Sequence, residues 1–215
     1  MSIFFEYAEV FAAGLALTLV VAASASLGGT FVGLLTAIAR MSRQTAVRWL
    51  AAGYVEVFRN TPGLVQLFLI YLGLPVIGIR LSPLMALIVA LTINNGAYLA
   101  EVFRAGLQAV PKGQLEAAAS IGLSRRVTFV DVVLPHMLHA MYPALTNQFI
   151  QTVLFSSIGT VVGVEELTQV TLILESRTYR TVELLTVLTA LYVALTFALA
   201  WGSRWLGTRL ERGYR

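Results

Sequence analysis

The chain has 215 residues, of which 58% are hydrophobic and 12% are charged, and its formal net charge at pH 7 is +4. A soluble domain carries about 25% charged residues, so this chain could fold in water only by exposing apolar patches of a size that soluble monomers rarely show. Composition therefore excludes an ordinary soluble domain, and the scattered basic residues do not indicate a nucleic-acid-binding surface. We predict a single integral membrane domain over residues 1–215.

Five apolar segments are long enough to cross a bilayer as helices, because a spanning helix needs about 20 residues. In chain order they comprise residues 11–39, 49–79, 84–102, 137–162 and 184–201. The first has no basic residue ahead of it and is too long for a signal peptide, so we interpret it as a permanent span. The sequence thus predicts an all-α membrane protein with five transmembrane helices and a polar loop at about residues 104–135.

Basic residues are concentrated in alternate connections between these segments. They follow the first span, lie between the third and fourth spans, and follow the fifth span: Arg40, Arg43, Arg48, Arg104, Lys112, Arg125, Arg126, Arg204, Arg209, Arg212 and Arg215. Cytoplasmic connections of membrane proteins are enriched in Lys and Arg. We therefore expect the N-terminus outside, the C-terminus in the cytoplasm, and the loop at 104–135 in the cytoplasm.

The second span carries two charges and a proline within the stretch YVEVFRNTPGLVQLF. Glu56 and Arg59 are three residues apart and can pair on one helix face, whereas Pro62 lacks a backbone N–H and is expected to kink the helix. Charged groups inside a membrane are costly and usually have a partner or a function. The pair could fix helix packing near the cytoplasmic end, or it could serve as a gate or as a contact with another subunit.

The third span holds two asparagines and a tyrosine at helical spacing. Tyr98 lies three residues after Asn95 and four after Asn94, so the three side chains can share one side of the helix. They could line a hydrophilic path for a solute, or they could form hydrogen bonds between helices. The sequence leaves both interpretations open.

The fourth span carries a longer polar stripe. Gln148, Gln151 and Thr152 share a helix face, Phe155 lies one turn further on, and Ser156 follows it. This many amide and hydroxyl groups exceeds what hydrogen bonding between helices requires. We interpret the stripe as facing a substrate, with packing between helices as the alternative.

The sequence offers no catalytic or metal-binding set. It contains no cysteine and no GxxxxGK[ST] phosphate loop, so we do not expect the chain itself to bind or hydrolyse ATP. His136 and His139 are three residues apart, but no carboxylate or thiolate accompanies them, and we expect no metal site. Asp131 is the only aspartate, which leaves no Ser/His/Asp set. We predict a chain without enzymatic activity or a cofactor of its own.

One soluble-looking segment, EAAASIGLSRRVTFVDVVLP, lies in the loop between the third and fourth spans. Its EAA triplet at 116–118 is followed by three residues and Gly122, and then by nine residues and the pattern V-x-L-P at 132–135. This spacing resembles the EAA loop of ATP-binding-cassette (ABC) importer permeases, with Val132 standing where the family has isoleucine. The alanines favour a slim helix, and Gly122 allows the chain to turn at its end.

The resemblance implies a type I ABC importer permease architecture, in which this short helix docks in a groove of the ATPase and transmits its closure to the membrane helices. By resemblance, the coupling residues are Glu116, Ala117, Ala118, Gly122, Arg125 and Arg126. The implied partners are a cytoplasmic ABC ATPase dimer that binds ATP and Mg²⁺, a second permease subunit that is identical or homologous, and an extracytoplasmic amino-acid-binding protein. The implied location is the bilayer of a bacterial cytoplasmic (inner) membrane, with no nucleic-acid partner.

Flanking segments narrow the resemblance to the polar amino acid uptake family, whose permeases serve histidine, glutamine, arginine and glutamate. The similar stretches are YVEVFRNTPGLVQLF, AYLAEVFRAGLQAVPKGQLEAA, GVEELT and SRTYRTVE, and the resemblance extends from Phe11 to the terminal LERGYR. Relatives often carry an acidic residue where this chain has Gln148, and a Lys-Asp pair where it has Leu154-Phe155. A cationic ligand would need facing carboxylates. The departure therefore favours a neutral, amidated or less polar amino acid, or a subunit that has no substrate site of its own.

Three alternatives are weighed against an ATP-driven amino acid importer. The solute could be an opine or another amino acid derivative. A secondary transporter driven by an ion gradient would predict inverted repeats and a carboxylate near the membrane midplane, but the chain shows no repeat and Glu56 has Arg59 close by. A membrane scaffold would leave the polar stripe and the EAA segment unexplained.

Overall fold

The computed structural model describes residues 2–212 of the chain and the side chains of residues 3–207. Within these limits the chain is helical and contains no strand, which confirms the predicted all-α fold. Arg215 and the last three residues of LERGYR lie outside the described residues. The elements in chain order are α1 (Ser2–Glu6), α2 (Ala8–Arg40), α3 (Thr45–Arg59), α4 (Gly63–Phe68), η1 (Leu69–Gly73), η2 (Leu74–Ile77), α5 (Pro83–Gln108), α6 (Lys112–Ser120), α7 (Arg125–Val127), η3 (Thr128–Val133), α8 (Leu134–Phe155), η4 (Ser156–Val162), α9 (Leu167–Thr178) and α10 (Thr181–Arg212).

Three helices of the described chain, α2, α5 and α10, are long and apolar enough to cross a membrane. Two bent helix pairs raise this number to five if each pair is one span. The first pair joins Thr45–Arg59 to Gly63–Ile77 with a bend of 107°, and the second joins Arg125–Val162 to Leu167–Thr178 with a bend of 47°. The segment predicted at 49–79 therefore covers a broken helix pair. The segment at 137–162 lies within the first member of the second pair, and the other three lie within single helices.

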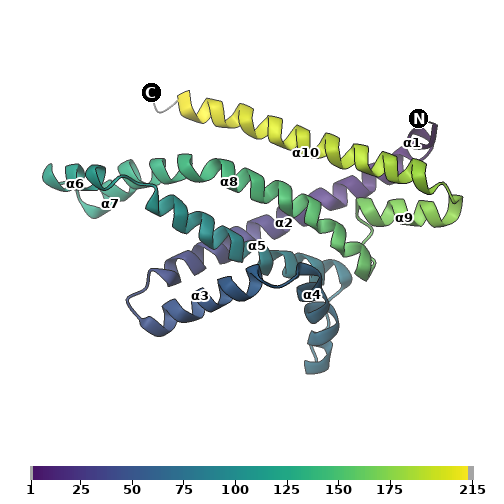
Figure 1. Ribbon diagram of the computed structural model, residues 1–215, viewed down its shortest axis with the longest axis horizontal. Coiled ribbons are helices and arrows are strands. Elements are labelled where there is room, and N and C mark those ends of the chain that lie inside the picture. Colours follow the sequence, from purple (N-terminus) through teal and green to yellow (C-terminus); the bar gives the residue numbers. More distant parts are fainter. Residues whose placement is uncertain (1, 213–215) are drawn as a thin grey trace.

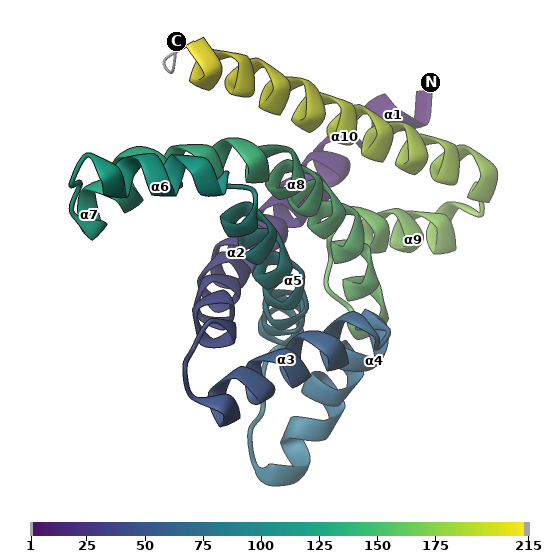
Figure 2. The ribbon, with the colours of Figure 1, turned by 60° about the vertical axis from the view of Figure 1, so that its left-hand side comes forward.

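The core of the molecule is the close packing of α2 against α5, which run side by side in the same direction (Figures 1 and 2). Glycines on α2 make this approach possible. A Cβ placed on Gly29 would lie 2.9 Å from the amide nitrogen of Asn95, and one on Gly33 would lie 2.8 Å from the Cβ of Leu99. Small residues allow helices to pack closely in membranes, so these glycines fix the position of α5.

The other helices surround this pair on two sides. Helix α10 lies along one side, against α8 and α9, and α3 and α4 lie on the opposite side (Figures 1 and 2). Helices α6 and α7 form one end of the molecule, whereas α1 and α9 lie at the other end (Figure 1). The fold therefore separates the EAA segment from the N-terminal end.

Helix α6 ends at Ser120, as the glycine two residues later predicts. Gly122 has a φ of 73°, in the left-handed region that favours glycine. The N–H groups of Gly122 and Leu123 donate to the carbonyls of Ala119 and Ala118 at 3.1 Å each, which is the Schellman arrangement that satisfies the last carbonyls of a helix. Ser124 then caps α7 by accepting a hydrogen bond from the N–H of Val127 at 3.3 Å.

Candidate functional site: a polar cavity between α5, α8 and the α3–α4 break

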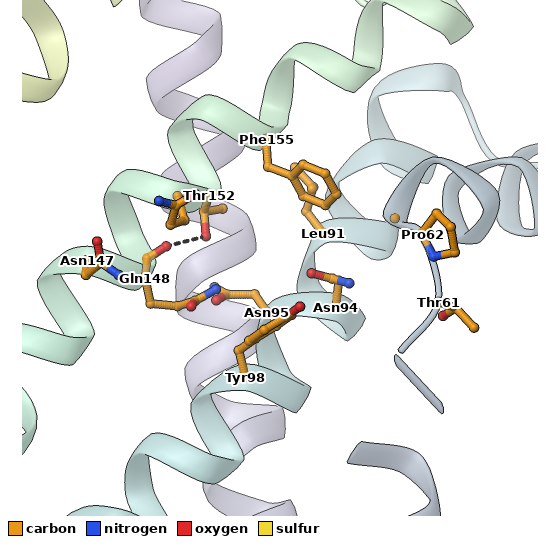
Figure 3. A pocket seen from close by; sticks show the side chains of 12 residues that line it. Thr61, Pro62, Leu91, Asn94, Asn95, Tyr98, Asn147, Gln148, Thr152 and Phe155 are labelled. Atoms are coloured by element: carbon orange, nitrogen blue, oxygen red, sulfur yellow. Dashed lines mark hydrogen bonds between the residues drawn. The ribbon is translucent and has the colours of Figure 1, made fainter. Parts of the chain in front are cut away.

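A cavity of about 540 Å³ lies where the break between α3 and α4 meets the middle of α5 and of α8. This volume is typical of sites for small molecules. The residues that line it are Thr61, Pro62, Gly63, Leu91, Asn94, Asn95, Tyr98, Asn147, Gln148, Gln151, Thr152 and Phe155 (Figure 3). None of these twelve residues carries a charge, so the wall offers amides, hydroxyls and the aromatic rings of Tyr98 and Phe155.

The structure brings together seven of the eight residues that the sequence places on a substrate path. Asn94, Asn95 and Tyr98 come from α5, and Gln148, Gln151, Thr152 and Phe155 come from α8. Ser156 is the exception: it is fully buried, and its hydroxyl donates to the carbonyl of Val153 at 2.8 Å. The chain tightens into the 3-10 turn η4 at this residue, so the helical periodicity on which the prediction rested no longer holds.

Two further lining residues were not among the predicted site residues, although they adjoin Pro62, which was. Thr61 and Gly63 flank that proline at the helix break. A Cβ at Gly63 would overlap the ring of Phe155, so this glycine allows the break to approach α8. The cluster Asn-Thr-Pro-Gly at 60–63 was the available signal, because such clusters interrupt helices. Pro62 itself marks a complete break, which is larger than the predicted kink.

Asn94 holds the break in place. Its amide nitrogen donates to the side-chain oxygen of Gln66 at 3.0 Å and to the carbonyl of Phe58 at 3.3 Å. Gln66 in turn donates to the hydroxyl of Thr61 at 2.8 Å and to the carbonyl of Phe58 at 2.9 Å. Backbone groups freed by a broken helix in a membrane must find such partners. Of the two interpretations, the geometry therefore gives Asn94 the structural one.

Asn95 differs from its neighbour. Its side chain is only 3% exposed, yet neither its amide nitrogen nor its amide oxygen has a hydrogen-bond partner. Most buried side-chain polar groups are bonded. In Figure 3 Asn95 extends toward Gln148 across the cavity, and no hydrogen bond joins them. Asn95 therefore leaves both halves of its amide unsatisfied beside the cavity, where the chain shields them from solvent.

The predicted ion pair between Glu56 and Arg59 does not form. The amide nitrogen of Asn60 donates to the carboxylate of Glu56 at 3.1 Å, and the guanidinium carbon of Arg59 lies 5.3 Å from the centroid of the Tyr98 ring. Both charged residues are exposed on α3. Asn60 and Tyr98 therefore engage the two charged groups separately, and Arg59 contacts the cavity wall through Tyr98.

The EAA segment presents some of its residues outward and holds others against the chain. Glu116 and Ala117 are exposed, as are Arg125 and Arg126. Ala118 is only 3% exposed and faces η3 and the start of α8 across a hollow of about 440 Å³ whose wall includes Asp131, Val132 and His136. Ala118 therefore anchors α6 to its own chain, and the exposed residues are free to contact a partner.

A histidine of α8 also contacts α6. The Nε2 atom of His136 lies 3.1 Å from the amide nitrogen of Gln114. His139 is exposed, and the described residues hold no group of three or more potential metal ligands. This histidine contact ties the EAA segment to the start of the fourth predicted span.

Comparison with known proteins decides the class of this chain. Residues 29–212 match the family described as "Binding-protein-dependent transport system inner membrane component". The chain belongs to this family. It is a permease subunit of an ATP-driven amino acid importer, a multi-pass inner-membrane component whose ATPase site lies in another subunit. Family membership thus confirms the main interpretation of the sequence over the ion-gradient alternative.

Two relatives from Bacillus subtilis (strain 168) show how far this likeness extends. The "Probable glutamine ABC transporter permease protein GlnM" is 36% identical to this permease over 215 residues, which cover 100% of this chain and 99% of the relative. The "Arginine transport system permease protein ArtQ" is 32% identical over 200 residues, covering 93% and 90% respectively. The likeness therefore runs through the whole permease.

Solved structures agree in fold. A chain of the "Crystal structure of an amino acid ABC transporter with histidines" superposes with a TM-score of 0.90 at 37% identity, with 96% of each chain covered. A chain of the MetNI methionine ABC transporter, in an inward-facing conformation, gives a TM-score of 0.77 at 21% identity, covering 95% of this permease and 98% of that chain. Both support the predicted type I ABC importer permease architecture.

Proposed function

We propose that the cavity between α5 and α8 is a transport site for an amino acid with an uncharged side chain, and that Asn95 and Gln148 contact it. The observation that carries this proposal is the buried, unpartnered amide of Asn95 at the wall of a cavity without charged residues. A ligand amide can satisfy both halves of such a group, since an amide offers donors and acceptors together.

The absence of charge on the wall favours a neutral or amidated side chain over a cationic one. A charged side chain taken from water into this cavity would lose hydration without meeting an opposite charge. The two relatives described above are named as a probable glutamine permease and an arginine permease. The amide-lined wall supports an amidated substrate, such as glutamine, over a cationic one.

We further propose the orientation and the coupling. The end of the molecule formed by α6 and α7 faces the cytoplasm and the end formed by α1 and α9 faces outward, with the C-terminus inside. Helix α6 docks in the ATPase through Glu116 and Ala117, and Arg125 and Arg126 contact it beyond the turn at Gly122. ATP and Mg²⁺ are held by the ATPase dimer, a second permease subunit completes the membrane part, and a binding protein outside delivers the amino acid.

Uptake into proteoliposomes that contain the permease, its ATPase and its binding protein tests the transport site. In Gln148→Glu we expect uptake of an amidated amino acid to fall about tenfold or more, because a donor to the ligand is replaced by a charge, and relative uptake of a cationic amino acid to rise. Ser156→Ala is the matched control in the same segment, and its uptake should stay unchanged. An unaltered ratio of the two substrates in Gln148→Glu would remove Gln148 from the site.

A further inference from the structure

An apolar groove of about 620 Å³ opens between the last turns of α2, the end of α5 and the segment η3. Eleven of the twelve residues that line it are apolar, and Ser42 is the exception. Ile38 of α2 and Phe129 of η3 are exposed at this groove, whereas Phe103 of α5 is buried. The groove shares no lining residue with the polar cavity, so it is a separate hollow that needs an explanation of its own.

The groove lies at the end of the molecule that carries α6 and α7. Helix α2 ends on this side (Figure 1), and Phe129 belongs to the EAA segment itself. Trp49, near the start of α3, is 73% exposed. Tryptophan is enriched where a membrane meets water. These features place the groove in the part of the bilayer that adjoins the lipid headgroups.

Two arginines beside the groove have no acidic partner among the described residues. Arg43 directly follows Ser42, and Arg48 donates a hydrogen bond to the carbonyl of Ser42 at 3.2 Å. Both arginines are exposed, and neither takes part in an ion pair of the described chain. Arg40 differs, because its charge is matched by Glu101. The Ser42 edge of the groove therefore carries two uncompensated positive charges.

An apolar groove with positive charge at one edge matches the two parts of an anionic phospholipid. Basic residues beside pockets between membrane helices bind anionic headgroups on the cytoplasmic side, and a guanidinium can donate two parallel hydrogen bonds to a phosphate. A second helix fits less well. A helix is about 10 Å wide, so the groove would hold only about one and a half turns of it.

We propose that this groove binds an anionic phospholipid of the cytoplasmic leaflet, with an acyl chain between α2 and η3 and the phosphate against Arg43 and Arg48. The proposal rests on the proposed function in one respect: the end of the molecule with α6 faces the cytoplasm, where the leaflet carries anionic lipids. The bound lipid would join a core helix to the EAA segment. It would thereby help to hold the segment in position relative to the membrane helices.

Two lipids that differ only in their headgroups test the charge contact. The complex of permease and ATPase, freed of lipid in detergent, is titrated with dioleoylphosphatidylglycerol or dioleoylphosphatidylcholine, and bound lipid is counted by native mass spectrometry. We expect the natural chain to prefer the anionic lipid at least about tenfold, and the double variant Arg43→Gln with Arg48→Gln to lose this preference. Arg80→Gln with Arg177→Gln is the matched control. It removes the same charge from two exposed arginines outside the groove and should keep the preference.

A groove-filling variant tests the acyl-chain contact. Ala39 lines the groove, so the ring of Ala39→Phe should take the place of the acyl chain and weaken binding of the anionic lipid about tenfold. Ala23→Phe puts the same ring on α2 at an exposed position outside the groove and should bind lipid as the natural chain does. Capture of the ATPase by both variants reports that they fold, and the arginine variants test the site independently of this substitution.

Several results of the titration would overturn the lipid site. These are equal binding of the two lipids to the natural chain, a preference that survives in Arg43→Gln with Arg48→Gln, and an equal loss of preference in the control pair. Unaltered binding in an Ala39→Phe variant that captures the ATPase would show that no acyl chain lies in the groove.

A single cysteine separates failure of the lipid site from failure of the proposed function. The chain contains no cysteine, so in Arg43→Cys a membrane-impermeant maleimide reports on one position. We expect no labelling in right-side-out membrane vesicles and full labelling once the vesicles are opened. Labelling of intact vesicles would make the proposed orientation wrong, whereas a failed lipid titration with a protected cysteine would make only the lipid site wrong.

Discussion

The carboxylate of Glu101 in α5 binds the guanidinium of Arg40 at the last residue of α2. The same carboxylate also binds Arg104, one turn further along α5, at 2.6 Å. Side chains of Glu101 and Arg40 are only 20% and 21% exposed. One acidic group thus joins the ends of the two core helices just before the chain enters the EAA segment.

Replacing this carboxylate should loosen that end of the core. Glu101→Gln keeps the shape but leaves two cations without their partner, and we expect it to cost about 1 to 2 kcal/mol, between the values for exposed and buried pairs. The measurement is the midpoint of thermal unfolding in detergent. Glu183→Gln is the control, since it removes the exposed Arg180–Glu183 pair and should change stability by about 0.5 kcal/mol or less. Equal effects of the two variants would contradict a structural role for Glu101.

Two neighbouring asparagines should separate stability from transport. Asn94→Ala removes the bonds to Gln66 and Phe58 and leaves buried polar groups unsatisfied, at a cost of about 1 to 3 kcal/mol. Asn95→Ala breaks no hydrogen bond of the described chain, so the thermal midpoint should hardly change, but uptake should fall about tenfold or more because the ligand loses its amide partner. Each variant serves as the control for the other when the thermal midpoint and the uptake of both are measured in parallel. If Asn95→Ala transported normally, this residue would not contact the substrate.

The polar residues of the cavity differ in how well the sequence could predict their arrangement. The cost of placing polar groups in an apolar span identified Asn95 and Gln148 separately, because that cost is local to each helix. That they extend toward each other across one cavity depends on the packing of α5 against α8, which no local pattern encodes. The spacing of Glu56 and Arg59 allowed an ion pair, but Asn60 competes for the carboxylate from the same helix and Tyr98 holds the guanidinium from another.

The EAA segment was easier to predict because its features are local. The alanine content favours a helix over 112–120, and a glycine is the residue that ends one in a left-handed turn, so the position of Gly122 predicted where α6 stops. The inward position of Ala118 was not predictable, since the sequence does not reveal which side of a short helix packs against η3 and the start of α8. One of the coupling residues, Ala118, is buried against the chain. The structure leaves four others exposed: Glu116, Ala117, Arg125 and Arg126.

The turn at Gly122 provides the sharpest test of coupling to the ATPase. Gly122→Ala forces a Cβ into the left-handed region, which costs about 1 to 2 kcal/mol, and no neighbouring atom lies within 4 Å of that Cβ, so the effect is purely one of backbone conformation. We expect the detergent-purified variant to fold and to bind the ATPase less tightly, with amino-acid-stimulated ATP hydrolysis reduced several-fold.

Gly113→Ala is the matched control for that variant. Gly113 lies within α6, the helix that the turn at Gly122 follows; a Cβ there also meets nothing within 4 Å, and its φ is not in the left-handed region. Alanine favours a helix over glycine by about 1 kcal/mol, so Gly113→Ala should leave ATPase binding unchanged or strengthen it. A loss of coupling in both variants would point to the surface of α6 as the cause, and normal coupling in Gly122→Ala would show that the end of α6 need not keep its left-handed turn for the ATPase to act through it.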